Sequence, residues 1–448
     1  MGKLTIDELE KKIQNGDIDT VVLAFPDHLG QLIGKRLTGR FFLDNRQTNC
    51  CNYLLTIDIE QNPLPGFKLA GWDKGYGDFL MLPDYSTIRE LRWQKQAAVI
   101  ICDLVHENGD PVDAAPRTIL QNQLNNLNAG KLEAMMASEL EFYLFDNSYD
   151  DVAREGYKGL VPSSLKSIDY NILSTGFEDE LLRDICNQVS AADIPVESRK
   201  GEAGKGQYEI GLLYCTALEM ADRHMIYKNG ARTIANAYGK SISFMAKYSE
   251  SDSGSSCHIH ISLLNNESGR NVFIDNNDES LFFRHFLGGL NLLASDFFLF
   301  FAPTVNSYKR FSSNSFAPTR IAWGYDNRTS SFRIVGSSEG FRIENRLPGA
   351  DINPYLAFAA TIAAGMYGVE NKIEPPPLNE GNTYMDETYP KVPDTLKEAA
   401  ENLNRSKIAR SIFGDDVIEH YVAHARIESA AYEKNVSPWE LKRYFKSV

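Results

Sequence analysis

Four short segments of the sequence share one pattern, in which polar side chains two residues apart alternate with apolar ones. Side chains at i and i+2 of a β-strand point to the same face. Each segment therefore predicts a strand with one apolar and one chemically active face. The same-face sets are Glu139 and Glu141 in MMASELEFYLF, Gln207 and Glu209 in GEAGKGQYEIGL (with Glu202 across a glycine-rich bend), His258, His260 and Ser262 in SGSSCHIHISL, and Arg342, Glu344 and Arg346 in GFRIENRLPG.

A single strand of this kind is typical of a half-solvated sheet. Four of them, all carrying ionisable groups, favour one sheet curved around a polar cavity. Five carboxylates and a histidine in one cavity need neutralising, because unpaired buried charge is very costly. Carboxylates with one histidine suit Mg²⁺ or Mn²⁺, whereas a structural Zn²⁺ site would use cysteine or more histidine.

Arginines accompany the carboxylates, and the segment DNRTSSFRIV adds Arg328 and Arg333. A lone arginine most often forms a surface ion pair. Several arginines opposite bound metal instead imply an anionic ligand, which is the layout of phosphoryl transfer. A metal-dependent hydrolase would explain the carboxylates but not so many arginines. The sequence has no P-loop, Rossmann, G-x-S-x-G or H-E-x-x-H motif, so the residues alone do not prove nucleotide use.

Alternating strands and helices must position these groups, which predicts an α+β protein. Strands are expected at 19–25 and 96–105, with a hairpin at 26–37, and a loop at 52–79. Helices are expected after Pro116, over 215–240 and over 353–372, where Pro354 suits a first turn. We place a domain boundary near 106–112, which gives a small N-terminal domain, 1–108, and a large domain, 109–448.

Composition excludes several classes of protein. The chain has 448 residues and a net charge of −14, which argues against nucleic-acid or anionic-membrane binding. The apolar run at 286–303 contains Asn291 and Asp296 and is interpreted as a buried helix, not a membrane span. The N-terminus is interpreted as an amphipathic helix, not a signal peptide. Six scattered cysteines without a C-x-x-C pair are typical of a reduced cytoplasmic protein.

Eight segments, taken in order, resemble the glutamine synthetase family over nearly the whole chain: GQLIGKRL, GYGDFLMLPD, ASELEFYLF, KGEAGKGQYEIGL, GSSCHIHISL, NSYKRF, APTRIAWGYDNRTSSFRI and RIENRLPGADINPY. The resemblance implies a β-grasp N-terminal domain and a catalytic domain built around a curved antiparallel sheet. It also implies self-association into two stacked rings, typically a dodecamer, with active sites between neighbouring subunits. The implied chemistry is ATP-dependent phosphorylation of the γ-carboxylate of glutamate, followed by attack of a nitrogen nucleophile.

The resemblance also assigns roles to single residues. Two or three Mg²⁺ (or Mn²⁺) ions would be held by two sets of ligands, and arginines would grip glutamate and the phosphates. The first metal set is Glu141, Glu202 and Glu209, and the second is Glu139, His258 and Glu344. Glutamate and the transferring phosphoryl group would contact Arg310, Arg346 and Gly254, and Tyr170 would lie near the amine. ATP would contact Arg328, Arg333, Arg342, His260, Ser262 and Tyr214. The expected catalytic set is Arg328, Arg310, Glu202 and Arg346. Tyr214 and Ser262 are equally well explained as packing residues.

One segment departs from the family pattern. In KRFSSNSFAPTR, residues 309–320, the family places a flap that shuts the site, and glutamine-forming members carry an acidic residue where this chain has Phe316. The acidic DGSS latch of those members is also missing, and Ser253 replaces the asparagine before Gly254. Ammonium needs carboxylates for capture and deprotonation, whereas a phenyl ring offers an apolar wall or a cation–π face worth about 0.5–2 kcal/mol. The same departure occurs in glutamate–amine ligases.

The departures favour an ATP-dependent carbon–nitrogen ligase that joins an organic amine to glutamate. A glutamine synthetase that uses ammonia is the alternative. A ring-forming relative without catalysis is a third possibility, which the presence of all six candidate metal ligands disfavours. Asp58, Glu60 and Asp73 lie in the loop that could reach the amine, although solvated loop charges explain them equally well.

Overall fold

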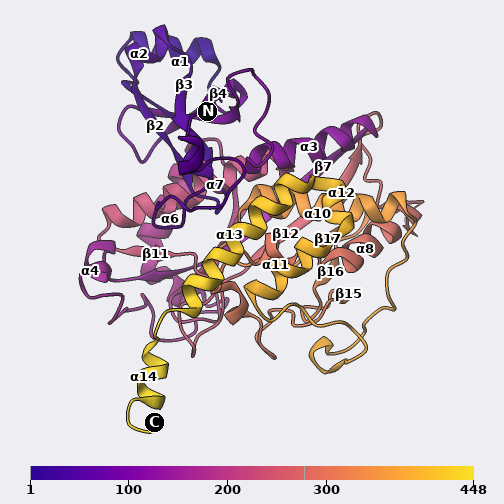
Figure 1. Ribbon diagram of the computed structural model, residues 1–448. Helices are drawn as coiled ribbons and strands as arrows, with labels where there is room; N and C mark the ends of the chain where they lie inside the picture. The colour runs from indigo at the N-terminus through magenta and orange to yellow at the C-terminus, as the bar shows by residue number, and fades with distance from the viewer. Residues whose placement is uncertain (1, 277) are drawn as a thin grey trace.

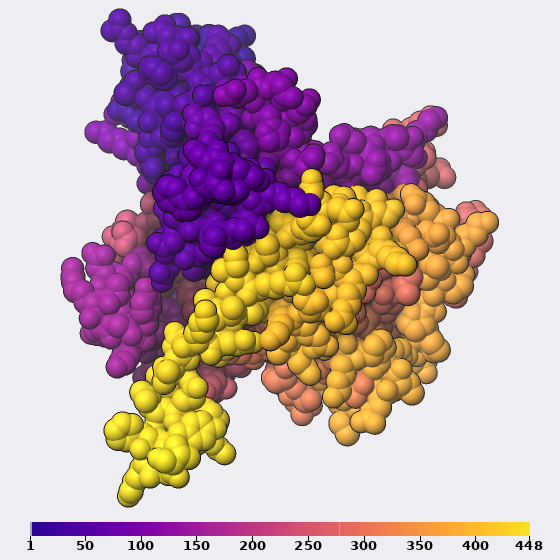
Figure 2. Space-filling model, viewed as in Figure 1, coloured from indigo at the N-terminus to yellow at the C-terminus, as the bar shows by residue number. Residues whose placement is uncertain are grey.

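The computed structural model describes residues 2–276 and 278–448 and has the expected α+β architecture. A small N-terminal lobe lies on a larger body (Figure 1). The body is built on a sheet with helices packed against it, and its C-terminal end, α14 (Pro438–Tyr444), extends away from the rest (Figure 2). None of the described helices is long and apolar enough to cross a membrane.

The N-terminal lobe is a mixed six-stranded sheet with the order β2-β1-β6-β4-β3, and β5 also pairs with β6. Its strands are β1 (Thr20–Pro26), β2 (Leu32–Thr38), β3 (Thr48–Cys51), β4 (Asp78–Pro83), β5 (Arg89–Leu91) and β6 (Ala97–Val105), and its helices are α1 (Ile6–Gln14) and α2 (Gly39–Asp44). The predicted hairpin is confirmed by β1 and β2, which pair antiparallel. The loop predicted over 52–79 is largely irregular, although β4 begins within it.

Strand β6 is apolar on both faces because both faces are buried. Ala98, Ile100 and Cys102 enter the core of the lobe, whereas Val99 and Ile101 enter the core of the large body. A strand buried on both sides is expected to be a continuous apolar run. The two parts therefore share a wall at β6, and the division at 108/109 stays a prediction.

The large body contains a nine-stranded sheet with the order β15-β16-β17-β12-β7-β9-β8, and β10 and β11 also pair with β7. The strands are β7 (Leu132–Phe145), β8 (Val196–Gly201), β9 (Gln207–Leu212), β10 (Cys215–Thr216), β11 (Ser241–Ser243), β12 (Cys257–Asn265), β15 (Trp323–Tyr325), β16 (Phe332–Val335) and β17 (Arg342–Asn345); β13 (Ile274–Asp275) and β14 (Asp278–Glu279) form a separate pair. Its pairs are antiparallel except β15 with β16. All four segments singled out by the alternating pattern lie in this one sheet.

The helices of the large body include those that bury the apolar face of the sheet. They are α3 (Pro116–Ala129), α4 (Tyr149–Arg154), α5 (Ile172–Thr175), α6 (Asp179–Ala191), α7 (Ala217–Ala237), α8 (Leu281–Leu293), α9 (Phe298–Phe301), α10 (Pro354–Glu370), α11 (Leu396–Arg405), α12 (Lys407–Phe413) and α13 (Asp415–Glu433). Both α3 and α7 pack on β7, and α10 packs on α3, α7 and α8. The helix predicted over 353–372 is confirmed as α10, which is covered on most sides and is apolar nearly all round.

The single helix predicted over 286–303 is wrong in one respect, because the segment forms two helices, α8 and α9, separated by a turn at 294–297. One straight helix presents a limited face to a core. The turn allows Phe297, Phe298, Phe300 and Phe301 all to be buried. The adjacent glycines in α8 permit close helix packing, since a Cβ on Gly289 would lie 2.1 Å from the carbonyl oxygen of Ala364 in α10.

Candidate active site

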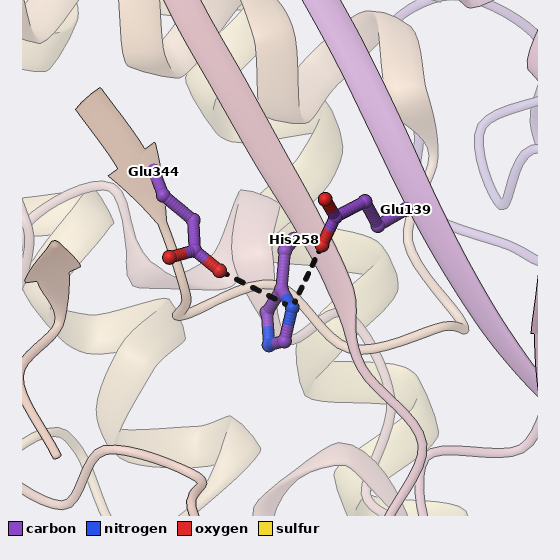
Figure 3. Close-up of side chains that lie close together, drawn as sticks. All are labelled: Glu139, His258 and Glu344. Atoms are coloured by element: carbon purple, nitrogen blue, oxygen red, sulfur yellow. Dashed lines mark ion pairs between the residues drawn. The ribbon is translucent and has the colours of Figure 1, made fainter. Parts of the chain in front are cut away.

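Three neighbouring strands place Glu139, His258 and Glu344 together (Figure 3). His258 on β12 lies opposite Glu139 on β7 in the register, and β17 carries Glu344 on the other side of β12. The Nδ1 atom of His258 is 3.5 Å from a carboxylate oxygen of Glu139 and 3.4 Å from one of Glu344. The alternating pattern predicted this cluster correctly from three segments that are distant in sequence.

A second group contains Glu141, Glu209 and, again, His258, with ligand atoms within 4.8 Å of one another. Glu141 on β7 lies opposite Glu209 on β9. One oxygen of Glu141 accepts hydrogen bonds from the backbone N–H of Ser256 at 2.8 Å and from Nε2 of Gln207 at 3.1 Å. These bonds fix the carboxylate and leave its other oxygen for a ligand.

Electrostatics divides the carboxylates into two kinds. Burial and the carboxylate of Glu139 raise the pKa of Glu209 to about 8, and burial with the charges of Glu202 and Glu209 raises the pKa of Glu141 well above its ordinary value. Burial also opposes ionisation of Glu344, but Arg346 and His258 outweigh it and lower its pKa to about 2. The Glu141–Glu209 side thus has too little positive charge nearby to offset its burial.

The donor set fits divalent metal ions. Carboxylate oxygens and an imidazole nitrogen are ligands of Mg²⁺ and Mn²⁺. Burial and the charge of Arg346 lower the pKa of His258 to about 4, so its imidazole is neutral, as a metal ligand must be. A cation bound between Glu141 and Glu209 would supply the charge that those carboxylates lack.

Glu202 lies beside these groups but outside them. Its carboxylate pairs with Lys200, whose Nζ is also 3.7 Å from Glu209. Lys200 therefore holds two of the three carboxylates that were assigned to the first metal. Lys200 was not identified from the sequence, although Lys200 and Glu202 have the same two-residue spacing as the other pairs.

Arginines line the opposite side of the cluster, as expected. Glu344 accepts from Nη1 of Arg346 at 2.6 Å and from Nη1 of Arg333 at 3.0 Å. Nε of Arg342 donates to Nδ1 of His260 at 3.1 Å. The remaining ring nitrogen of His260, Nε2, then carries the proton and donates to Glu139 at 2.9 Å.

Among the arginines predicted to contact a substrate, Arg310 is the most buried, with 2% of its surface exposed. Its guanidinium donates to Oγ of Ser256 at 3.2 Å and to the backbone carbonyl of Leu347, while its Nε has no partner among the described atoms. Gly254 lies against its stem, since a Cβ there would be 2.4 Å from Cγ of Arg310. Arg310 thus joins the Gly254 loop to the segment after β17.

Phe316 lies near the tip of the flap (residues 309–320) and exposes 62% of its surface. Its backbone has a φ of +58°, which is unusual for an aromatic residue. Two bonds hold the flap main chain here: Nη2 of Arg346 donates to the carbonyl of Phe316 at 3.3 Å, and the hydroxyl of Tyr384 donates to the carbonyl of Ala317 at 3.0 Å. Tyr384 was not identified from the sequence, because its partner is 67 residues away.

Four predicted residues lie outside this cluster. Tyr214, just after β9, is 61% exposed, and Arg328 is exposed on the turn after β15. Ser262 lies further along β12, opposite Met135. Tyr170 is 66% exposed, with Nζ of Lys200 4.8 Å from its ring centre. Their assigned contacts stay predictions.

Comparison with known proteins gives the family. A sequence model described as "Glutamine synthetase, catalytic domain" matches residues 113–444. The chain belongs to the glutamine synthetase family. Among curated members, it is 46% identical over 448 residues to the gamma-glutamylethanolamide synthetase of Streptomyces coelicolor, covering 99% of this chain and 96% of the relative. It is 34% identical over 441 residues to the glutamate–isopropylamine ligase of a Pseudomonas species, covering 96% of each.

The family fold extends over the whole chain. A solved structure titled as a GmaS/ADP complex superposes with a TM-score of 0.86 at 24% identity, covering 98% of this chain and 100% of that one. At this identity the similarity concerns the fold. Together with the family match, it confirms the fold class that the ordered motifs predicted.

Proposed function

We propose that the protein is an ATP-dependent carbon–nitrogen ligase that joins an organic amine to the γ-carboxylate of L-glutamate. The products are a γ-glutamylamide, ADP and phosphate. The observation that carries the proposal is Phe316, an exposed phenyl ring on a flap whose main chain is bonded to the same arginine as Glu344. The names of the two curated relatives, one for a γ-glutamylethanolamide and one for ligation of isopropylamine, support it.

The reaction has two balanced steps. An oxygen of the γ-carboxylate attacks the γ-phosphorus of ATP, the bond to the bridging oxygen breaks, and ADP leaves. The amine nitrogen then attacks the γ-carbonyl carbon, the carbon–oxygen bond to phosphate breaks, and the amine loses a proton. Both steps develop negative charge on oxygen, which a dry site with preorganised cations stabilises.

The metal side of the site would be held by two groups of ligands. Glu139, His258 and Glu344 are proposed for one ion, and Glu141 and Glu209, with Glu202 beside them, for another. Two or three Mg²⁺ or Mn²⁺ ions would supply charge neutralisation for the phosphates. The chain contributes a neutral imidazole and carboxylates already fixed by hydrogen bonds.

The arginines are proposed to bind the anionic parts of the substrates. Arg310 and Arg346, with the backbone at Gly254, would orient glutamate and the transferring phosphoryl group. Arg328, Arg333 and Arg342 would meet the phosphates of ATP, with His260, Ser262 and Tyr214 nearby. Arg346 is bonded to both Glu344 and the flap, so it can align the phosphoryl group with the closing flap.

The amine is proposed to lie against Phe316, with Tyr170 near the same entrance. A ring gives an organic amine an apolar surface and a cation–π face but supplies no base. Ammonium could meet the cation–π face but has no hydrocarbon to bury, so it would gain less from such a pocket than an organic amine. An organic amine is therefore the substrate class that fits this flap.

Assembly into stacked rings, with a dodecamer as the expected form, and a cytoplasmic location are further parts of the proposal. The end of the chain supports self-association, because Trp439, Leu441 and Phe445 are 56%, 52% and 87% exposed. Large apolar side chains gathered on one protruding segment are typical of an interaction surface.

The test is phosphate release with glutamate, Mg²⁺ and ATP against ammonia, ethanolamine, putrescine, alkylamines and aromatic amines. Saturable turnover with an organic amine is expected. Turnover with ammonia alone would identify a glutamine synthetase instead, and no glutamate-dependent phosphate release with any nucleophile would favour a non-catalytic relative.

A further inference from the structure

Two consecutive carbonyls of the flap are held by side chains from different parts of the body. The carbonyl of Phe316 is held by Arg346, and that of Ala317 by the hydroxyl of Tyr384 at 3.0 Å. Tyr384 is only 9% exposed and lies in η7 (Thr383–Met385). Its hydroxyl is thus a fixed donor placed directly behind the flap tip.

The segment that carries Tyr384 is also bonded to the turn that carries Arg328. Residues 379–386, here the tether segment, contact residues 327–330 through several short bonds. The backbone N–H of Thr383 donates to Oγ1 of Thr329 at 3.0 Å, and Nδ2 of Asn327 donates to the carbonyl of Gly381 at 2.9 Å and to Oδ1 of Asn379 at 3.1 Å. Thr383 is 1% exposed, so its bond to Thr329 lies in a largely buried position, whereas the bond between Asn327 and Gly381 is exposed.

The tether segment therefore contacts both ends of the proposed reaction. One side holds the turn with Arg328, which is proposed to meet the ATP phosphates, and the other side holds the flap beside Phe316. A connection made of several hydrogen bonds keeps two loops in one relative position. A flap held in place matters most after phosphoryl transfer, when the acyl phosphate must meet amine and not water.

We propose that Tyr384 is a positioning residue that keeps the flap closed over the γ-glutamyl phosphate, in register with the Arg328 turn. This inference rests on the proposed function. When the flap opens, water attacks the γ-carbonyl carbon, the carbon–oxygen bond to phosphate breaks, and glutamate and phosphate form with release of a proton. Tyr384 thus determines how much ATP is spent on the amide rather than on hydrolysis.

The first test compares Tyr384→Phe with Tyr389→Phe. Tyr389 lies just beyond the tether segment, is 6% exposed and donates its hydroxyl to the carbonyl of Pro377 at 2.7 Å. Its backbone carbonyl accepts from Nη1 of Arg320 at 2.9 Å, a bond that Tyr389→Phe keeps, so it is a matched buried tyrosine whose hydroxyl is not bonded to the flap. The ratio of phosphate released to amide formed is measured with the best organic amine. We expect a ratio near one for the wild type and Tyr389→Phe, and about a two- to tenfold rise for Tyr384→Phe, as the loss of one hydrogen bond allows.

The second test needs no turnover. Amide hydrogen exchange of a peptide that covers residues 309–320 is followed by mass spectrometry in the same three proteins. Exchange is expected to be about two- to tenfold faster in Tyr384→Phe alone. Unchanged exchange, or equal acceleration in Tyr389→Phe, overturns the positioning role. If the wild type forms no amide but flap exchange is still faster in Tyr384→Phe than in the wild type, the proposed function is contradicted and the flap contact of Tyr384 is supported.

Discussion

Arg346 is bonded at once to Glu344, at 2.6 Å, and to the backbone carbonyl of Phe316, at 3.3 Å. One guanidinium therefore joins a candidate metal ligand to the flap. Because the bond is to the main chain of Phe316, its ring stays free and exposed. The side chain at this position can change without loss of the connection, which makes it a suitable site for setting nucleophile choice.

Replacing Phe316 by glutamate is expected to move selectivity from organic amine toward ammonia. A carboxylate at the flap tip would attract ammonium and accept its proton, and the apolar wall would be lost. The ratio of kcat/KM for organic amine to that for ammonia should fall by at least about tenfold, a size typical of losing an apolar contact. Phe316→Leu keeps an apolar surface and is the control. An equal ratio in wild type and Phe316→Glu would contradict the assignment of the ring.

Glu344→Gln is expected to weaken metal binding and abolish turnover. The change removes a negative charge between His258 and two arginines. Loss of a residue that only hydrogen-bonds a metal ligand already lowers metal affinity by about 10–100-fold. Mn²⁺ titration by calorimetry measures the loss directly. Exposed Glu107→Gln should bind Mn²⁺ as the wild type does. Unchanged Mn²⁺ affinity in Glu344→Gln would refute its role as a ligand.

Gly254→Ala should raise the KM for glutamate by roughly tenfold. The added Cβ would lie 2.4 Å from Cγ of Arg310 and 2.9 Å from the carbonyl oxygen of Ala246, so the arginine must move, at a cost of about 1–3 kcal/mol. Gly176→Ala, where a Cβ meets nothing within 4 Å, is the control. If glutamate saturation is the same in both variants, Arg310 does not position glutamate.

Buried histidines between the N-terminal lobe and α13 are expected to contribute a loss of stability in mild acid. His28 and His424 stack with ring centres 3.7 Å apart, and burial lowers the pKa of His424 to about 4 and those of His28 and His420 well below the ordinary value. Below pH 6.5 the unfolded chain binds protons that the folded chain does not, so stability is lost as pH falls from about 6.5 toward 4. His424 alone accounts for about 2 kcal/mol at pH 5.

Asp27 acts in the opposite sense, since burial raises its pKa to about 7 and its proton stabilises the fold as pH falls below that value. Glu141 and Glu209, whose pKa values are also raised, act in the same sense as Asp27, so the histidine contribution has to be isolated as a difference between variants. The free energy of unfolding is measured at pH 8 and pH 5, and between these values that of His424→Gln should rise relative to that of the wild type by about 2 kcal/mol. Exposed His106→Gln should behave as the wild type. A difference between the wild type and His424→Gln that is the same at pH 8 and pH 5 would refute the effect.

The sequence predicted the candidate site well where side-chain alternation determined it. Glu139, His258 and Glu344 each lie on a strand, and the period of two places them on one face in any register that buries Ile259 and Ile343. The mixed sheet of the N-terminal lobe was harder to predict from the sequence, because the parallel pairing of β1 with β6 joins strands more than 70 residues apart. Such pairing depends on tertiary packing rather than on local pattern.

Loop contacts could not be predicted in the same way. Lys200 has a visible two-residue spacing to Glu202, but its position between Glu202 and Glu209 depends on the bend that follows β8. Tyr384 and Ala317 meet through two irregular segments, to which no period applies. These contacts depend on the fold of the loops, which hydrophobic periodicity does not describe.

The most direct test of the central claim is a competition. The protein is given glutamate, ATP and Mg²⁺ with equal concentrations of ammonia and the organic amine that supports the fastest turnover, and both products are quantified by mass spectrometry. The account predicts that the γ-glutamylamide exceeds glutamine by at least about tenfold. Glutamine as the main product would contradict it.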